Sequence, residues 1–498
     1  MRPRVLALGC CTALAVSCLL LRRLRRRRPT GLVLPRPQSA VGTFLRILTI
    51  NDIYTIENYP RFRRALDANR AAAGAMDCVV ISTLAGDFLS PSTFTCMDGG
   101  STLAAGVNHA GLDFVSLGNH EFDLDLETVR AQIATLSAEA INSNVDEPAL
   151  AHLPRHALVR VGRARTAVLA GAVTDDKRIY TRSYAMRPVT AALVAAWDEA
   201  TAASGGRLSD VFIPMTHQLM KDDRATAAAL GKHAALRSRT PIILGGHEHD
   251  AYVEQQEGEP MILKTGCDAQ RIGVVDVWWR GDGALRCAAS LLPTDDYEPE
   301  PTAAAWAEAK RAELAQIMQA ELTRLPRAIS SKPVRSGPSG VASFLCSCVK
   351  RALSVELAIS QGGVCRGAKD YEAGHAFTMA DLFAEYPTGN MQAVVPLPGR
   401  VLRDALRFTR SRPKPTPSFL HCDDDATVSD AHELTAINGA PLEPDRVYTV
   451  AINRNLLTGL DDVEPLVAFV EETSLQVPER AACPTARELL LSFFSQKT

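Results

Sequence analysis

The chain has 498 residues, a formal net charge of −2, and a composition that is 46% hydrophobic and 22% charged. These values are typical of a folded globular protein, and the length suggests roughly two to four domains. The near-neutral charge gives no reason to expect a nucleic-acid partner.

Residues 1–40 are predicted to form a hydrophobic anchor or a targeting segment. The stretch 5–21 is a charge-free run of 17 residues, and an arginine tract follows at 22–28. By the positive-inside rule, this pattern predicts a membrane anchor with the catalytic part of the protein in the cytoplasm. No acidic residue precedes Asp52, which is also typical of an organelle transit peptide. A cleaved secretory signal is the third alternative.

Cysteine usage points weakly to a reducing compartment. The chain has twelve cysteines and no CxxC pair, so a structural zinc knuckle is not expected. The sequence also contains no N-x-S/T glycosylation motif.

Residues 41–295 are predicted to form an α/β domain. Short apolar runs alternate with helical patterns, and many of the runs recur about every 30 residues, which is typical of βαβ units. The predicted strands are 44–50, 78–86, 113–118, 166–173, 210–216 and 241–246, with helices over 61–75 and 124–138.

A Pro-rich and acidic break at 293–302 ends this domain. A linker helix is predicted within 296–328, and a second domain within 329–498. The strand-like runs of the second domain are 356–360, 391–397 and 447–452.

Polar residues of the kind that bind metals follow five of the strand predictions in the first domain. In open α/β sheets, ligand sites collect at the carboxyl ends of strands. Each residue also has a structural interpretation, such as a helix cap, an Asx-turn or a surface histidine. The residues are Asp52, Asp87, Asn119, His120, Asp123, His217, His247 and His249.

The ordered series D…GD…GNHEFD…TH…GGHEH resembles the calcineurin-like metallophosphoesterases. The GNHEFD form, together with "GGVCR" in the second domain, is similar to the 5'-nucleotidase branch. The resemblance runs from about Phe44 to the C-terminus. It implies an α/β fold with a four-layer β-sandwich flanked by helices, and a smaller α+β C-terminal domain joined by a linker helix.

The resemblance implies two divalent metal ions, with Mn, Zn, Fe and Mg all suited to such ligands. Asp87 would bridge the ions. Asn119, His217 and His247 would complete one site, and Asp52 and His249 would belong to the other. His120 would stand beside the phosphoryl group as a catalytic residue, with Asp123 orienting its ring.

The first motif departs from the family pattern, which usually has D-x-H where this chain has Asp52, Ile53 and Tyr54. A neutral phenol is a poor ligand for a divalent ion. Tyr54 would therefore either bind a highly charged metal as phenolate or pack and hydrogen-bond nearby. In both cases the first metal position is expected to be weaker.

The second domain also departs from the family. "SQGGVCRG" resembles the nucleotidase N-G-G-x-x-R stretch and implies substrate binding by Gln361, Gly362, Gly363 and Arg366. A surface salt bridge is the alternative for Arg366. Phe419 is one predicted wall of a base-stacking slot, but the segment 453–463 lacks the aromatic residue of the opposite wall.

The predicted function is a metal-dependent phosphoric monoester hydrolase that is 5'-nucleotidase-like. Its partner would be a small-molecule phosphate ester, a nucleotide or a related compound. One alternative is a catalytically degenerate relative that binds a phosphorylated ligand or a protein. The other is a hydrolase of phosphodiesters or nucleotide sugars.

Overall fold

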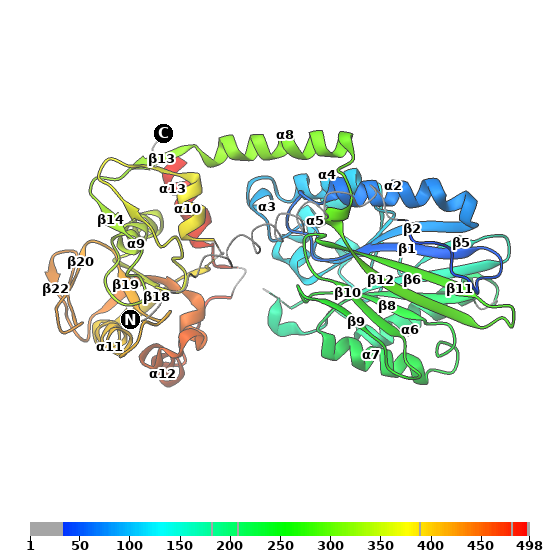
Figure 1. Ribbon diagram of the computed structural model, residues 1–498. Helices are drawn as coiled ribbons and strands as arrows, with labels where there is room; N and C mark the ends of the chain where they lie inside the picture. The colour runs from blue at the N-terminus through cyan, green and yellow to red at the C-terminus, as the bar shows by residue number, and fades with distance from the viewer. Residues whose placement is uncertain (1–32, 181–182, 207–208, 388–389, 480–481, 496–498) are drawn as a thin grey trace, which may run out of the picture. The chain divides into compact units, whose positions relative to one another are not determined.

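A computed structural model describes residues 33–180, 183–206, 209–387, 390–479 and 482–495 (Figure 1). The chain divides into two compact units between Arg311 and Ala312. The domain limits predicted from the sequence are 41–295 and 329–498. This division into two units does not test them, and they stay a prediction.

Two six-stranded sheets make up the first unit. The first sheet has the order β12 (Leu285–Pro293), β11 (Arg271–Trp279), β1 (Phe44–Ile50), β2 (Cys78–Ala85), β3 (Phe114–Ser116) and β4 (Glu139–Ile141). The second has the order β5 (Ala157–Val161), β6 (Arg165–Val173), β7 (Val211–His217), β8 (Ile242–Gly246), β10 (Met261–Thr265) and β9 (Ala251–Glu254).

The side chains of these strands alternate between two cores, because successive residues of a strand point to opposite faces. In β6, Ala167 and Leu169 belong to the core between the two sheets, where they meet Leu45 of β1. Val168 and Ala170 belong to a second core, against a helical layer. This double burial explains why the strands read as continuous apolar runs.

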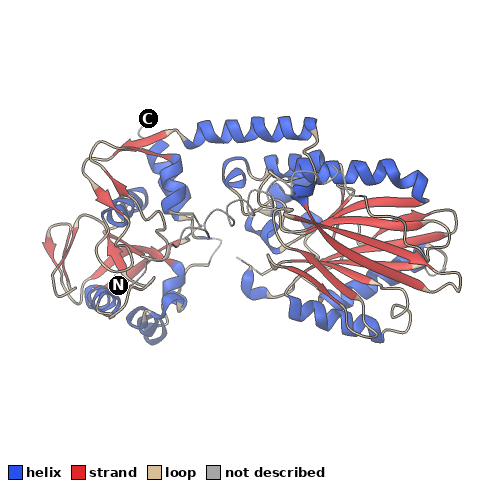
Figure 2. Cartoon of the chain, viewed as in Figure 1, coloured by secondary structure: helices blue, strands red, loops and turns tan. Residues whose placement is uncertain are grey.

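Helices cover the outer faces of both sheets (Figure 2). Trp197 of α6 packs its ring against Phe212 of β7, behind the second sheet. The result is the predicted four-layer α/β sandwich, which is confirmed. The helices of this unit are α2 (Tyr59–Met76), α3 (Thr93–Asp98), α4 (Ser101–Ala110), α5 (Leu126–Ile133), α6 (Val189–Ala203) and α7 (Met220–Lys232).

Parallel pairing places several strand ends at the same edge of each sheet. In the first sheet β1, β2, β3 and β4 pair in parallel. In the second sheet β6, β7, β8 and β10 do so. The carboxyl ends of the strands in each set therefore lie together, as expected for a ligand site in an α/β sheet.

The second unit is built on a four-stranded sheet in the order β18, β23, β15, β19. One face packs on helices α9 and α13 and the other on α11 and α12, so the sheet has a core on each side. The bounds are β15 (Leu357–Gln361), β18 (Gln392–Pro398), β19 (Leu420–Cys422), β23 (Val447–Asn453), α9 (Gly340–Leu353), α10 (Met379–Glu385), α11 (Gly399–Arg410), α12 (Glu464–Thr473) and α13 (Ala486–Ser495).

Three small sheets complete this unit. Their strands are β13 (Glu321–Arg324) with β17 (Ala376–Thr378), β14 (Ile329–Ser330) with β16 (Asp370–Tyr371), and β20 (Ala426–Val428) with β21 (Leu434–Ile437) and β22 (Ala440–Pro441).

The linker helix is shorter than the predicted range 296–328. Helix α8 spans Pro301–Met318, and residues after it form β13. The reason is tertiary: β13 pairs in antiparallel fashion with β17, whose residues lie about fifty positions later.

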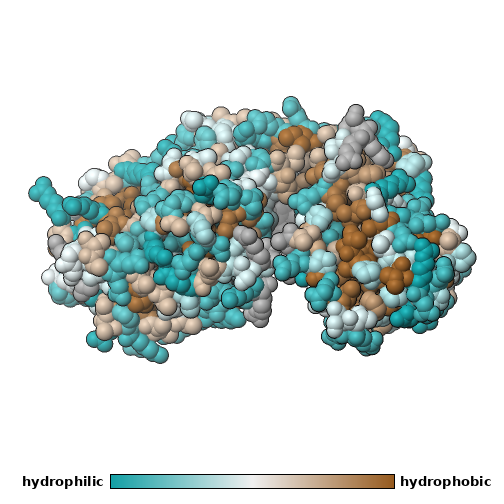
Figure 3. All heavy atoms as spheres, turned by 180° about the vertical axis from the view of Figure 1, so that it is seen from behind, coloured by the Kyte–Doolittle hydropathy of each residue, from teal (hydrophilic) through white to brown (hydrophobic). Residues whose placement is uncertain are grey.

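The surface of both units is mixed in character. On the face shown in Figure 3, hydrophobic side chains gather in patches between hydrophilic ones. The exposed large hydrophobic residues include Leu158 and Val447, which lie on different units. Single exposed residues of this kind are normal on a folded protein and identify no docking face.

The predicted membrane anchor at residues 5–21 lies outside the described residues. Among the residues that the structure describes, no helix combines the length with the apolar character needed to cross a bilayer. This finding contradicts the predicted membrane-anchored localisation, and membrane association is not supported.

A buried ion pair joins two neighbouring strands of the first sheet. Arg46 on β1 is fully buried and binds Asp276 on β11 through two parallel hydrogen bonds, Nε to Oδ1 at 2.6 Å and Nη2 to Oδ2 at 2.7 Å. The remaining guanidinium N–H groups donate to the carbonyl oxygens of Leu34 and Pro35 and to Asn69. The charge is thus compensated only while Asp276 is present.

We expect Asp276→Leu to lower the free energy of unfolding by about 3–5 kcal/mol, because it leaves the Arg46 charge buried without a partner. Urea unfolding measures the change. The double variant Arg46→Met with Asp276→Leu removes both charges and should recover most of the loss. Equal destabilisation of the single and the double variant would contradict this account.

Candidate metal centre

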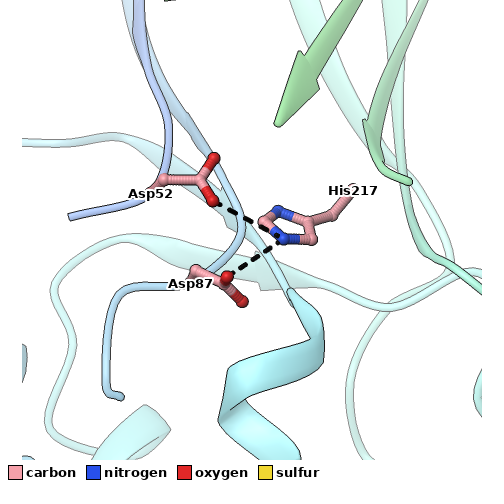
Figure 4. Close-up of side chains that lie close together, drawn as sticks. All are labelled: Asp52, Asp87 and His217. Carbon is pink, nitrogen blue, oxygen red and sulfur yellow. Dashed lines mark ion pairs between the residues drawn. The ribbon is translucent and has the colours of Figure 1, made fainter. Parts of the chain in front are cut away.

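The carboxyl ends of strands from both sheets meet at one buried cluster. Asp52 follows β1, Asp87 follows β2, and His217 is the last residue of β7. Their ligand atoms lie within 4.8 Å of one another, and at most 1% of each residue is exposed. In Figure 4 both carboxylates face the His217 ring. Charged groups at this depth need a partner of opposite charge or a metal ion.

The backbone turns sharply where these strands end. Asp52, Asp87 and His247 have φ values of 56°, 57° and 87°, in the left-handed region that residues other than glycine rarely adopt. Such strain collects at functional sites, where the surrounding structure holds it. At each of the three residues the chain therefore turns sharply as it leaves the strand, and the residue stays at the cluster.

Two motif glycines are required by close contacts. A Cβ atom at Gly118, which precedes the predicted ligand Asn119, would lie 2.1 Å from Oδ1 of Asp87. A Cβ atom at Gly246, which precedes His247, would lie 2.3 Å from the carbonyl oxygen of Ala85. These glycines let three strand ends pack against one another.

The His217 ring is oriented by one hydrogen bond. Its Nδ1 lies 2.8 Å from the carbonyl oxygen of Ala85, which can only accept, so Nδ1–H is the donor. Nε2 lies 3.1 Å from Oδ2 of Asp87 and 3.8 Å from Oδ1 of Asp52. Among the described residues, Nε2 has no partner with hydrogen-bond geometry. In the neutral ring its lone pair thus points at two carboxylates.

The charges of the cluster show the same need for a cation. Burial opposes charge on His217, but Asp87 and Asp52 outweigh it and raise the pKa of the imidazole to about 10. Burial opposes charge on Asp87 as well, yet His217 lowers the pKa of that carboxyl to about 2. Burial raises the pKa of Asp52. Without a metal ion, a protonated His217 is the positive charge that balances the carboxylates.

Asn119 and His247 lie on the other side of Asp87. Asn119 begins the 3-10 turn η1 (Asn119–Asp123) after β3, and its Oδ1 lies 2.8 Å from Nδ1 of His247. The rings of His217 and His247 have centroids 5.3 Å apart. Burial and the charge of His217 lower the pKa of His247 to about 4, so its imidazole stays neutral, as a metal ligand must be.

Tyr54 lies among the other predicted ligands. Its Oη is 3.0 Å from each of Oδ1 of Asp52, Oδ2 of Asp87 and Nε2 of His249. The backbone N–H of Tyr54 donates to Oδ1 of Asp268 at 2.9 Å, which holds the residue in place. Burial and the two carboxylates raise the pKa of the phenol well above its ordinary value.

His120 and Asp123 form a pair at the edge of the cluster. Nδ1 of His120 donates to Oδ2 of Asp123 at 2.6 Å, and the backbone N–H of His120 donates to Oδ1 of Asp87 at 2.9 Å. Burial disfavours the imidazolium, but the bond to Asp123 and the charge of Asp87 outweigh it and raise the pKa of His120 to about 9. The pair is half-exposed, so a bound molecule can reach the ring.

Glu121 is a structural member of the site to which the sequence motif assigned no role. This fully buried carboxylate accepts hydrogen bonds from the backbone N–H groups of Asp87, Phe88, Leu89 and Gly118, at 2.6–3.0 Å. It therefore ties the end of β2 to the end of β3. Its place inside GNHEFD was the available signal.

Lys264 on β10 is the second structural residue that the sequence did not reveal. Its buried ammonium group donates to the carbonyl oxygens of Gln218 at 2.7 Å and Gly246 at 2.8 Å. It also forms ion pairs with Asp223, at 2.8 Å, and with Glu248. These contacts tie the residue after His217 to the residue before His247. A lysine inside the apolar strand "MILKT" was the only signal.

The predicted substrate residues of the second unit also come together. Gln361 ends β15 and pairs with Leu420, and Gly362 N–H donates to the carbonyl oxygen of Phe419 at 2.9 Å. Gln361 is buried, and within the described residues its Oε1 has no partner.

Gly363 and Arg366 lie in the loop after β15. Gly363 N–H donates to the carbonyl oxygen of Pro417, and Arg366 Nε donates to the carbonyl oxygen of Gly363 at 3.1 Å. Phe419 is only 4% exposed, with the Arg410 guanidinium 5.1 Å from its ring centre. The Phe419 ring as placed is therefore covered rather than open to a base.

The donor set of the first unit fits a metal ion. Asp87, Asn119, His217 and His247 supply a carboxylate oxygen, an amide oxygen and two imidazole rings, a mixture that suits divalent transition metals. His217 Nε2 faces Asp87 and has no partner with hydrogen-bond geometry among the described residues. A cation bound to this nitrogen would satisfy it. The fixed bond from Nδ1 to Ala85 is the support that metal-binding histidines usually have.

Comparison with known families identifies the second unit. Residues 314–468 match the model of the 5'-nucleotidase C-terminal domain. A comparison with curated proteins found no match.

Solved structures of low sequence identity share the fold over nearly the whole chain. A putative 5'-nucleotidase from Staphylococcus aureus, in complex with alpha-ketoglutarate, is 16% identical with a TM-score of 0.62 over 91% of this chain and 96% of its own. A 5'-nucleotidase precursor from Thermus thermophilus is 17% identical with a TM-score of 0.55 and the same coverage. A Thermus sulfate thiohydrolase in complex with glycerol is 14% identical with a TM-score of 0.53, over 94% and 95%.

The structural likeness shows the fold, and the family match names the second domain. Together they confirm the resemblance read from the motifs. Residues 314–468 therefore belong to the 5'-nucleotidase C-terminal domain family, and the chain as a whole has the two-domain fold of solved proteins named as 5'-nucleotidases.

Proposed function

We propose that the chain is a metal-dependent hydrolase of phosphate monoesters, with a 5'-nucleotide or a related small molecule as its substrate. The orientation of His217 carries the proposal. Its Nδ1–H is committed to Ala85, so Nε2 turns toward Asp87 and Asp52. At this place Nε2 needs either a proton or a metal cation, because a bare lone pair so close to anionic oxygens is unfavourable.

Asp87, Asn119, His217 and His247 would hold one divalent ion. Asp52 and His249 are the groups that the resemblance assigns to a second ion. A bound ion of this kind lowers the pKa of a coordinated water to near neutrality and withdraws charge from phosphate oxygens. Mn, Zn, Fe and Mg are all compatible with the ligand types.

His120 is the proposed catalytic residue, positioned by Asp123. Because Nδ1–H donates to Asp123, the ring orientation is fixed and Nε2 is the nitrogen left for a ligand. An imidazolium in this place would donate Nε2–H to a phosphoryl oxygen or protonate the leaving oxygen. The half-exposed position of the pair supports contact with substrate.

The second unit is proposed to bind a nucleotide-like small molecule. The match to the 5'-nucleotidase C-terminal domain supports a nucleotide-like compound. Gln361, Gly362, Gly363 and Arg366 are the proposed substrate-binding residues, because they gather at one loop. The burial of Phe419 supports substrate selection by phosphate and polar groups more than by stacking of a base.

We expect His120→Ala to lower kcat by about 10²–10⁴-fold and to leave the metal content unchanged, because the imidazole acts on the substrate and not on the ion. Hydrolysis of adenosine 5'-monophosphate with added Mn²⁺ measures kcat, and elemental analysis of the same samples measures the metal. His152→Ala, which alters an exposed histidine of the same unit, is the matched control. A normal kcat in His120→Ala would remove the assigned role, and loss of metal would reassign it.

We expect Glu121→Gln to lower the free energy of unfolding by about 1–3 kcal/mol, because the amide cannot accept all four backbone hydrogen bonds. The metal should also dissociate faster, since Asp87 loses its support. Denaturant unfolding of the metal-free protein and dialysis of the loaded protein measure the two effects. Glu127→Gln, on an exposed position of α5, is the control. Unchanged stability and unchanged metal retention would show that Glu121 does not hold the site together.

A further inference from the structure

Tyr54 stands where the family pattern has a histidine ligand, and it contacts the three other groups assigned to that metal position. Its hydroxyl oxygen is equidistant, at 3.0 Å, from Asp52 Oδ1, Asp87 Oδ2 and His249 Nε2. Asp52 Oδ1 and His249 Nε2 are themselves 3.7 Å apart. The phenol oxygen thus lies among the side chains that would hold an ion at this position.

The hydroxyl is held there from two sides. The backbone N–H of Tyr54 is bound to Asp268, and the ring lies edge-on to His120 and tilted against His249, with centroids 6.2 and 5.2 Å away. The side chain cannot leave the position without breaking these contacts. An ion would have to share the position with the hydroxyl oxygen of Tyr54.

Asp52 is satisfied without an ion. Its Oδ2 accepts from Asn51 Nδ2 at 2.7 Å and from His247 N–H at 2.9 Å, and its Oδ1 accepts from the Tyr54 hydroxyl. A carboxylate with three donors is well compensated when it is buried. His217 Nε2 lies 3.1 Å from Oδ2 of Asp87 without hydrogen-bond geometry, and in the described part of the chain it has no other partner. The ligand atom that a cation would satisfy is therefore His217 Nε2 rather than an oxygen of Asp52.

We propose that this centre holds a single metal ion, bound by Asp87, Asn119, His217 and His247, and that the Tyr54 hydroxyl takes the place of the second ion, with its one proton donated to Asp52 or to Asp87. This inference rests on the proposed function and changes its metal count. The chemistry that remains is one coordinated water beside His120, with Asp52 acting through hydrogen bonds. Tyr54 is thereby a residue that determines metal stoichiometry.

The test measures bound metal rather than activity. The purified protein is freed of metal, loaded with excess Mn²⁺ and passed through a desalting column. Elemental analysis then gives the ions per chain, and electron paramagnetic resonance shows whether they are magnetically coupled through a shared carboxylate. We expect about one Mn²⁺ per wild-type chain, with the spectrum of an isolated ion, and about two coupled ions in Tyr54→His, which restores a full ligand set.

Two further variants locate the ions. His217→Ala should lose the single ion, because it removes a ligand of the retained position. Tyr252→His adds a histidine on β9, outside the centre, and should leave the count at about one. Circular dichroism of each metal-free variant checks that it is folded.

Each other result overturns a distinct statement. Two coupled ions in the wild-type chain would overturn the inference and leave the proposed function standing. One ion in both wild type and Tyr54→His would overturn the role of Tyr54. One ion retained by His217→Ala would overturn its assigned position. No ion bound to the folded wild-type chain would overturn the metal-dependent function itself.

Discussion

The buried carboxylate of Asp87 is the point on which the two sheets of the first unit converge. It stands 1% exposed at the end of β2, and it meets His217 from the second sheet, the backbone N–H of His120 after β3 and the hydroxyl of Tyr54 after β1. A charge at this depth is tolerated only if groups from every side compensate it. The sandwich is thus closed around an anion, and a cation completes the balance better than protein donors alone.

The fold itself leaves the substrate open. The same two-domain architecture occurs in solved proteins named as 5'-nucleotidases and in one named as a sulfate thiohydrolase. A fold positions a site, and the chemistry of the site selects the reaction. In this chain we propose that the selective features are the His120–Asp123 pair in the first unit and the Gln361–Arg366 loop in the second, together with a Phe419 ring that is buried.

Much of the fold could be predicted because strands buried on both faces read as continuous apolar runs. The run 44–50 coincides with β1, all of whose residues are buried. The gathering of Asp52 with Asp87 also follows from local rules, since the parallel strands β1 and β2 bring their carboxyl ends together, whereas His217 comes from the other sheet.

The features that could not be predicted depend on partners far apart in the chain. Lys264 bonds a carbonyl 46 residues away, and β13 ends the linker helix early because it pairs with β17. In the sequence, Tyr54 stands where the family pattern usually has a histidine, so the departure itself could be predicted. Only the fold shows that its hydroxyl lies within 3.0 Å of two carboxylates and an imidazole.

The strained backbone at Asp52, Asp87 and His247 has to be maintained by the rest of the structure. A left-handed residue other than glycine costs of order 1–3 kcal/mol, and three of them stand side by side here. Glu121 holds the turn at Asp87 through four backbone N–H groups, and Lys264 holds the carbonyl before His247. Both clamps are made by the chain's own groups, so the geometry of the centre is set during folding. An arriving ion would then find its donors already oriented, and it would lose little affinity to ordering them.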